Sequence, residues 1–408
     1  MVLSKDLPWQ AGVFFAVTRS IPGDTTPFNR STIFSMRKKR LFIGMVLLGA
    51  VFLSACVGGA IRGTTWSGLS ADETTAYLAD VTLVYGINLN DGREVWRFSD
   101  ADDSKAQFYA NPVITPDGLV IIGSAAGEHI LYALDTNDLI ADGDKKSPTK
   151  EWTYVGADGP WVASPLIVDN MLYAPNSNGN LYVFDLNDGR SQKEPVQVIE
   201  LGGRLWAQPV TDGERIYVTS LDHSIFGVDM QTFSYWEKEV TAAIPGSPVF
   251  GADGMLYVGS LASQLEKFDP KTGEHETVLD SEAWIWSTPV MDGDNLYFGD
   301  LEGNFYSFNT STSDLNWSVR PDGPITASAV LQNDHLLLAT ESGNVYAIGK
   351  EGQTLWFETV RDERNDGKIY TTPVVAGDLI LVSSLETEFY LTALDADGRT
   401  IWTFVPEN

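Results

Sequence analysis

Between residues 64 and 408 the chain consists of short runs in which apolar and polar residues alternate. In the last part of the chain these runs are Tyr370–Val375, Leu379–Ser383, Phe389–Leu394 and Thr400–Phe404, with the turn-forming pairs Gly377-Asp378 and Asp397-Gly398 between them. Alternation with a period of two is typical of β-strands, and long stretches with helical periodicity are absent. The pattern therefore predicts an all-β protein.

The four-run pattern repeats, and most copies carry a proline near their start. This key position is occupied by Pro112, Pro165, Pro209, Pro248, Pro289, Ala329 and Pro373, at gaps of 53, 44, 39, 41, 40 and 44 residues. A degenerate first copy, Thr64 to Trp96, brings the number of copies to eight. Four short antiparallel strands repeated every 40 or so residues describe the blades of a β-propeller, which bury both faces on their neighbours. We expect an eight-bladed propeller of four-stranded antiparallel blades over residues 64–408.

The spacing also predicts which blades are longer than the minimal four-strand repeat and how the ring closes. The longest gap places an insertion at Thr136–Lys150, expected as a surface loop on the blade that starts near Tyr109. A second excursion, Arg361–Lys368, precedes the last blade. The first and last copies each supply four runs, so we expect closure by face packing. A closing strand shared between the two ends of the chain is the alternative.

The repeat unit Pro-Val … Leu-Tyr-Val-Gly-Ser … Gly-x-Leu-Tyr-Ala-Leu-Asp … Thr-Gly-x-x-x-Trp resembles the pyrroloquinoline-quinone-like (PQQ-like, or quinoprotein-like) repeat. The resemblance covers essentially all of residues 64–408. The tryptophan that ends the unit occurs as Trp96, Trp152, Trp236, Trp317, Trp356 and Trp402. The resemblance implies that these side chains dock one blade on the next and have a structural role.

Three residues before the key position, each copy has a residue that should open the innermost strand of its blade. These residues are Trp66, Tyr109, Val162, Trp206, Pro245, Trp286, Thr326 and Tyr370. We expect them to ring one mouth of the central channel, where aromatic side chains either pack the entrance or stack on a sugar, a peptide or a planar cofactor. The candidate ligand contacts are Tyr109, Trp161, Trp206, Trp284, Trp286 and Tyr370. The small polar residues directly before the key position need no ligand, because lining the channel and binding water explain them.

Quinoprotein dehydrogenases with this repeat use a catalytic Asp, a calcium site and commonly a vicinal cysteine pair. The chain has one cysteine, no Cys-x-x-Cys-His haem motif, and no long insertions between blades that would roof a cofactor. The four histidines fall at unmatched repeat positions, and the acidic stretch Asp135–Asp144 lacks the spacing of a calcium loop. We expect no catalytic residues, no PQQ, no calcium and no other metal; a PQQ-dependent dehydrogenase is kept as an alternative.

The start of the chain has a pattern typical of an export signal. The basic residues Arg37–Arg40 precede an uncharged apolar run of 13 residues, Leu41–Leu53. A membrane-spanning helix needs roughly 20 such residues, whereas the hydrophobic part of a signal peptide needs about 7–15. We therefore expect a signal peptide at 36–55 that starts at Met36 and a short linker at 56–63. Residues 1–35 are then either an incorrectly assigned start or a disordered extension.

The residues Leu53-Ser54-Ala55-Cys56 resemble the bacterial lipobox, which implies that Cys56 becomes the lipid-modified first residue. An exported lipoprotein in the outer membrane facing the periplasm, or on the cell surface if there is one membrane, would result. Without residues 1–55, which hold seven basic and two acidic residues, the chain has 20 basic and 53 acidic residues and a net charge of −33. Such a charge repels phosphate backbones and disfavours nucleic-acid binding.

A lipobox, minimal blades and missing redox residues together resemble the BamB-like lipoprotein subunit of the outer-membrane β-barrel assembly machine. The resemblance implies a monomeric, non-catalytic scaffold for protein partners in the cell envelope. A propeller on the cell surface that binds a glycan or another ligand is the alternative, and the sequence does not separate the two.

Overall fold

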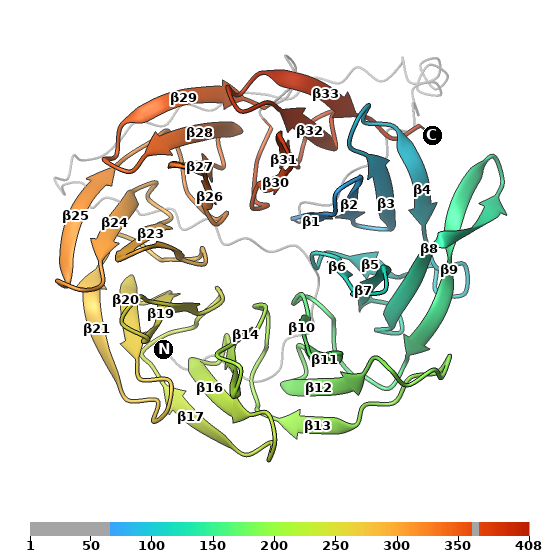
Figure 1. Ribbon diagram of the computed structural model, residues 1–408, viewed down its shortest axis with the longest axis horizontal. Helices are drawn as coiled ribbons and strands as arrows, with labels where there is room; N and C mark the ends of the chain where they lie inside the picture. The colour runs from blue at the N-terminus through green and yellow to red at the C-terminus, as the bar shows by residue number, and fades with distance from the viewer. Residues whose placement is uncertain (1–65, 361–366, 408) are drawn as a thin grey trace, which may run out of the picture. The chain divides into compact units, whose positions relative to one another are not determined.

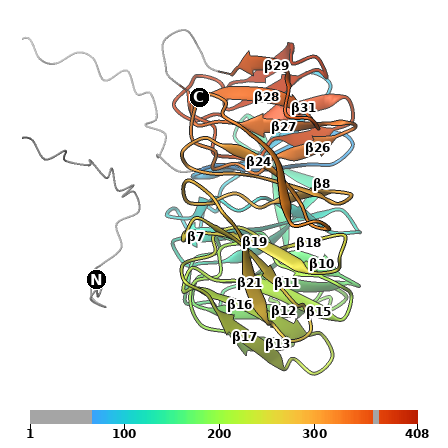
Figure 2. The ribbon, with the colours of Figure 1, turned by 90° about the vertical axis from the view of Figure 1, so that its left-hand side faces the viewer.

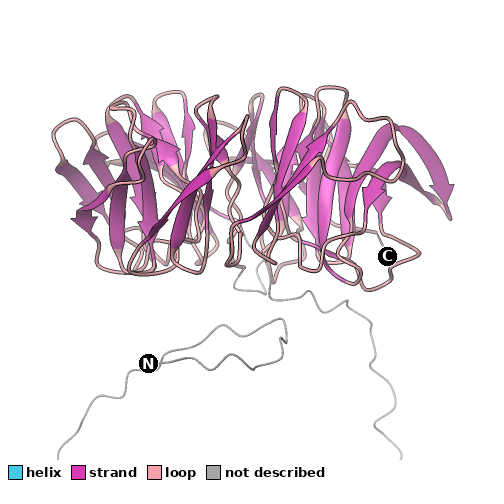
Figure 3. Ribbon diagram, turned by 90° about the horizontal axis from the view of Figure 1, so that it is seen from below, coloured by secondary structure: helices cyan, strands magenta, loops and turns pink. Residues whose placement is uncertain are grey.

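The computed structural model describes residues 66–360 and 367–407. This part of the chain contains the strands β1 to β33, joined by turns and loops, and no helix. They form eight sheets around a common axis (Figure 1). The strands run between the two flat faces of the ring, as the edge-on views show (Figures 2 and 3). The prediction of an all-β, eight-bladed propeller is therefore confirmed. The predictions for residues 1–63, including the signal peptide and Cys56, lie outside the described residues.

The strands are given blade by blade. Blade 1 has β1 (Gly68–Ala71), β2 (Thr75–Asp80), β3 (Leu83–Asn88) and β4 (Glu94–Phe98). Blade 2 has β5 (Gln107–Phe108), β6 (Val113–Ile114), β7 (Leu119–Ala126), β8 (Leu131–Asp142) and β9 (Lys145–Tyr154). Blade 3 has β10 (Leu166–Val168), β11 (Met171–Pro175), β12 (Asn180–Asp185) and β13 (Gln197–Glu200). Blade 4 has β14 (Val210–Thr211), β15 (Arg215–Thr219), β16 (Ser224–Asp229) and β17 (Tyr235–Glu239).

The second half of the ring follows the same plan. Blade 5 has β18 (Val249–Phe250), β19 (Leu256–Ser260), β20 (Gln264–Phe268) and β21 (His275–Asp280). Blade 6 has β22 (Val290–Asp292), β23 (Asn295–Gly299), β24 (Phe305–Asn309) and β25 (Asp314–Val319). Blade 7 has β26 (Val330–Gln332), β27 (His335–Ala339), β28 (Asn344–Gly349) and β29 (Thr354–Thr359). Blade 8 has β30 (Val374–Ala376), β31 (Leu379–Val382), β32 (Leu391–Leu394) and β33 (Thr400–Phe404).

Every blade is an antiparallel sheet whose strands pair in chain order, from the ring axis outward. In blade 2 the innermost strand is split into β5 and β6, which both pair with β7. Blade 8 contains only β30–β33 and blade 1 only β1–β4, so no strand is shared across the closing joint. Instead, buried residues of both blades, such as Leu78, Tyr85, Leu391 and Phe404, form one apolar cluster. The ring therefore closes by face packing.

The insertion Thr136–Lys150 is not the surface loop that its polar composition suggested. It lengthens β8 and β9 into a hairpin, with pairs from Leu139↔Pro148 to Asp142↔Lys145 and a turn at Gly143 (Figure 1). Strand pairing satisfies the backbone N–H and C=O groups of a segment whatever its side chains, so a polar stretch can continue a sheet beyond the core.

Within residues 66–360 and 367–407, no helix has the length and apolar character that a bilayer crossing requires.

Many acidic residues of this chain have a structural use in the turns. Between the third and fourth strands, carboxylates of Asp185, Asp229, Asp269 and Asp395 accept hydrogen bonds from backbone N–H groups two to four residues later. Asp and Asn are favoured at such places because their short side chains replace a backbone acceptor in the turn. Because the same turn recurs in several blades, the repeat places an aspartate at the surface each time.

Candidate functional site

The linker that leads into each innermost strand has a buried position four residues before the key position. Its occupants are Phe108, Trp161, Leu205, Ile244, Ile285, Ile325 and Ile369, none of them more than 1% exposed. They pack closely on the preceding blade. A Cβ atom placed on Gly259 would lie 2.1 Å from the Ile285 side chain, and one on Gly299 would lie 2.2 Å from that of Ile325. We call this the core position; it fixes each linker against its neighbour.

Trp161 does not meet the expectation that it contacts a ligand at the channel mouth. It occupies the core position of blade 3, is 1% exposed, and packs against Tyr154 and Tyr182 at ring-centroid distances of 6.5 and 5.3 Å. Its indole N–H donates a hydrogen bond of 2.7 Å to the carbonyl oxygen of His129. Successive side chains of an extended segment point to opposite sides, so Trp161 and its neighbour Val162 face different environments. Trp161 is a blade-packing residue.

The next residue of each linker is half-buried in all eight blades, and we call this the mouth position. Three of its aromatic residues come together there. Trp66 of blade 1 lies 6.3 Å from Tyr109 of blade 2 and 5.8 Å from Trp206 of blade 4, measured between ring centroids. The Trp206 indole N–H donates to Ser177 Oγ at 3.1 Å. Because blades 1 and 4 are not neighbours, the Trp66–Trp206 contact extends across the end of the ring axis.

Trp286 and Tyr370 occupy the mouth position in blades 6 and 8. Burial raises the pKa of Tyr370 to about 12, and the carboxylates of Glu341 and Glu386 add to the shift. Burial also raises the pKa of Glu341, against the opposing effects of Thr326 and Lys368. The mouth between blades 7 and 8 therefore combines a phenol with a carboxyl group that is partly withdrawn from water.

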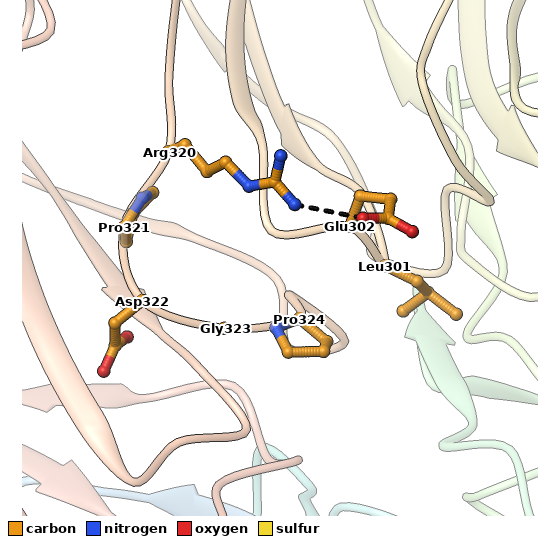
Figure 4. A pocket seen from close by; sticks show the side chains of 7 residues that line it. All are labelled: Leu301, Glu302, Arg320, Pro321, Asp322, Gly323 and Pro324. Carbon is orange, nitrogen blue, oxygen red and sulfur yellow. Dashed lines mark hydrogen bonds and ion pairs between the residues drawn. The ribbon is translucent and has the colours of Figure 1, made fainter. Parts of the chain in front are cut away.

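Trp284, the sixth candidate, lies two residues before Trp286 and is 51% exposed. Its carbonyl oxygen accepts a hydrogen bond of 3.0 Å from the N–H of Leu301 in the turn between β23 and β24. Beside this turn is a recess of about 440 Å³ between blades 6 and 7, shown in Figure 4. It is lined by Leu301, Glu302, Arg320, Pro321, Asp322, Gly323 and Pro324. The lining segment 320–324 leads directly into Ile325 and Thr326, so the recess belongs to the mouth face of the ring.

The small polar residues directly before the key position join the blades, a role that the sequence did not reveal. The backbone N–H of Asn111 donates to Ser164 Oγ at 3.0 Å, that of Thr288 to Ser328 Oγ at 2.9 Å and that of Ser328 to Thr372 Oγ1 at 3.1 Å. Each bond crosses from one blade to the next. The signal was available in the repeat. A Ser or Thr at the same position in successive blades places a hydroxyl oxygen where it can accept a hydrogen bond from the backbone N–H of the preceding blade.

The tryptophans at the end of the repeat lie against the following blade. Indole N–H groups donate to backbone carbonyls there in four cases, Trp236 to Pro270, Trp317 to Lys350, Trp356 to Ala396 and Trp402 to Leu89, over 2.8–3.1 Å. Each ring covers a glycine with positive φ in that turn, namely Gly273, Gly352, Gly398 and Gly92.

The other two tryptophans of this set make different contacts. Trp96 is buried among residues of blades 1 and 2. The Trp152 ring stacks on Phe184 at 6.2 Å and has the ammonium group of Lys193 5.4 Å from its centroid.

Two observations concern the expectation that the chain holds neither a metal ion nor a quinone. In ranges 66–360 and 367–407 no three His, Cys, Asp or Glu residues approach closely enough to hold a metal ion. At the mouth, Trp66 is in ring contact with both Tyr109 and Trp206, so a planar quinone would have to separate them before it could stack between them.

Comparison with known proteins gives concordant results. The family model of the outer membrane protein assembly factor BamB matches residues 60–275 and 200–408. An outer membrane protein assembly factor BamB from Kangiella koreensis is 25% identical over 191 residues, which are 45% of this chain and 46% of the relative, so the match spans about half of the relative's length.

Two solved structures show the fold. BamB from Moraxella catarrhalis has a TM-score of 0.60 at 20% identity over 82% of this chain and 94% of that one. The computationally designed Ika8 protein has a TM-score of 0.62 at 10% identity over 85% of this chain and 98% of that one. Since a designed protein matches as well as a natural one, this likeness concerns architecture alone.

Proposed function

Since the chain belongs to the family of the outer membrane protein assembly factor BamB, we propose that it is a protein-binding scaffold in the assembly of outer-membrane proteins. The family match over residues 60–408 is the observation that carries the proposal. The architecture supports it, because the core position and the inter-blade hydrogen bonds make a rigid ring whose linkers present side chains on one face. A rigid face of this kind binds a partner with little loss of conformational entropy.

The proposal includes an anchor and excludes catalysis. The lipobox-like sequence that ends at Cys56 supports lipid attachment and a position at the outer membrane. Replacing Cys56 with Ser should move the chain from the detergent phase to the aqueous phase in a phase-partitioning assay; continued membrane association would contradict the anchor. The contact between Trp66 and Trp206 and the single cysteine support a chain that works without PQQ. Dye-linked dehydrogenase turnover after addition of PQQ and calcium would overturn this part.

Mouth residues are the proposed contact with the partner, and Trp206 is the residue to test. Affinity purification of the tagged full-length chain from the native envelope should enrich components of the β-barrel assembly machinery. Trp206→Ala removes a half-buried ring at the mouth and should reduce this enrichment several-fold. Tyr235→Ala is the matched control, because Tyr235 is an aromatic residue of the same blade that is 44% exposed on the outermost strand β17. Equal enrichment by both variants would refute the role of the mouth.

A further inference from the structure

The recess between blades 6 and 7 has the features of a preformed binding site. Its two walls are the turn Leu301–Gly303 and the segment 320–324 (Figure 4). They touch through backbone, since a Cβ atom on Gly303, whose φ is +88°, would lie 2.5 Å from the carbonyl oxygen of Gly323. Pro321 and Pro324 restrict the backbone of the second wall. A ligand would therefore find the recess already formed.

The charged groups of the recess favour a cation. Arg320 and Glu302 form an ion pair of 3.0 Å across it, with 57% and 61% of their side chains exposed (Figure 4). An ion pair this exposed contributes little to stability, so another charged group can readily replace one of its two partners. The second carboxylate, Asp322, accepts hydrogen bonds from Thr340 Oγ1 at 2.8 Å and from Asn344 Nδ2, both in blade 7. An incoming cation replaces Arg320 at Glu302, whereas an anion has to displace Glu302 from Arg320.

The apolar surroundings indicate what carries the cation. The rings of Pro321 and Pro324 and the side chain of Leu301 offer a surface for the methylene stem of a long basic side chain. The backbone of Trp284 is tied to the lining residue Leu301 by the 3.0 Å hydrogen bond, and Trp284 is 51% exposed. A single half-exposed tryptophan is a typical anchor of protein interfaces. The exported part of the chain, with its net charge of −33, adds a long-range attraction for a basic partner.

We propose that this recess binds an arginine or lysine side chain presented by an extended segment of a partner protein, with an apolar neighbour of that residue packed on Trp284. The proposal rests on the scaffold function and specifies the chemistry of one partner contact. It separates this contact from the aromatic cluster of Trp66, Tyr109 and Trp206, which belongs to blades 1, 2 and 4.

The test uses the purified full-length chain in detergent and a capped Leu-Arg-Leu peptide, with binding measured by saturation-transfer NMR. The same peptide with citrulline in place of arginine has nearly the same shape without the charge. Saturable binding of the arginine peptide, at least several-fold stronger than that of the citrulline peptide, is expected. Equal binding of the two peptides, or no saturable binding of either, would overturn the proposal.

Two variants with opposite expected effects sharpen the result. Glu302→Gln should weaken binding about two- to five-fold, while Arg320→Gln, which frees Glu302, should strengthen it by a similar factor. Glu214→Gln is the matched control, a loss of one negative charge at a side chain that is 82% exposed in blade 4. An anion-binding recess would give the reverse signs and would refute the proposal. Because this assay contains no envelope proteins, its failure leaves the co-purification test of the scaffold function unaffected.

Discussion

The joint between blades 8 and 1 depends on Trp402, and its replacement offers a quantitative test of closure without a shared strand. The side chain is 9% exposed, its indole N–H donates to the Leu89 carbonyl oxygen at 2.9 Å, and its ring covers Gly92. Trp402→Ala removes all of these contacts at once. Truncation of a packed tryptophan costs about 3–5 kcal/mol, so we expect a loss of this size in the free energy of unfolding.

A second substitution separates the hydrogen bond from the packing. Trp402→Phe keeps most of the ring contact but leaves the carbonyl of Leu89, a residue that is 6% exposed, without its donor. An unpaired buried acceptor costs about 1–3 kcal/mol, so Trp402→Phe should lose roughly half as much as Trp402→Ala. Urea unfolding followed by far-ultraviolet circular dichroism measures both. Trp284→Ala, at a site 51% exposed, is the control and should change stability by less than about 0.5 kcal/mol.

A double-mutant cycle then locates the effect at the joint. A Cβ atom on Gly92 would lie 2.6 Å from the Trp402 ring, and Gly92 has a φ of +69°. Gly92→Ala alone therefore adds a collision to the backbone strain, whereas in the Trp402→Ala background only the strain remains. We expect the two substitutions to be non-additive by about 1 kcal/mol or more. A Trp402→Ala loss no larger than that of Trp284→Ala, or strict additivity with Gly92→Ala, would refute the account of the joint.

Three further substitutions test the packing and the charges. Burial lowers the pKa of Lys193, so the unfolded chain binds more protons as the pH approaches 10.5 and stability should rise with pH there; in Lys193→Met this rise should vanish from the thermal midpoints. Burial alone would raise the pKa of Asp253, but hydrogen bonds, foremost that from Lys267, hold it below its usual value; Asp253→Asn should therefore be less stable at pH 7, and the deficit should shrink in acid titrations as the pH falls below the usual Asp range and the carboxyl group takes up its proton. Gly299→Ala places a methyl group 2.2 Å from the Ile325 side chain and should cost about 1–3 kcal/mol in urea unfolding, which Ile325→Ala in the same chain should partly relieve.

The sequence predicted the ring well because period-two alternation and the eight key positions are repeated signals. It failed where one residue of register decides the outcome. Trp161 and Trp206 look alike as tryptophans before a key proline, yet they lie four and three residues before it, and this difference buries the first and half-exposes the second. Register of this kind is set by contacts with the preceding blade, such as that of Trp161 with Gly123, which composition does not reveal.

The hairpin at Thr136–Lys150 and the recess at Arg320 were not predicted from the sequence, for other reasons. The hairpin lacks an apolar alternation because most of its residues lie beyond the core, where backbone pairing continues the sheet. The recess arises from residues of two blades, the turn at Glu302 and the segment at Arg320, that come together only through ring geometry. Because the contact between these residues depends on how neighbouring blades are placed, no local sequence pattern predicts it.

Because every blade consists of strands that are consecutive in the chain, each joint of the ring is made by packing between whole sheets, and none requires two distant parts of the chain to complete one sheet. Circular permutants that open the chain at any linker between blades would therefore leave all sheets whole. Duplication or loss of a blade in the gene would likewise cut no sheet. A ring of this design can change its number of blades, or the order in which the chain visits them, through single genetic events between folded units.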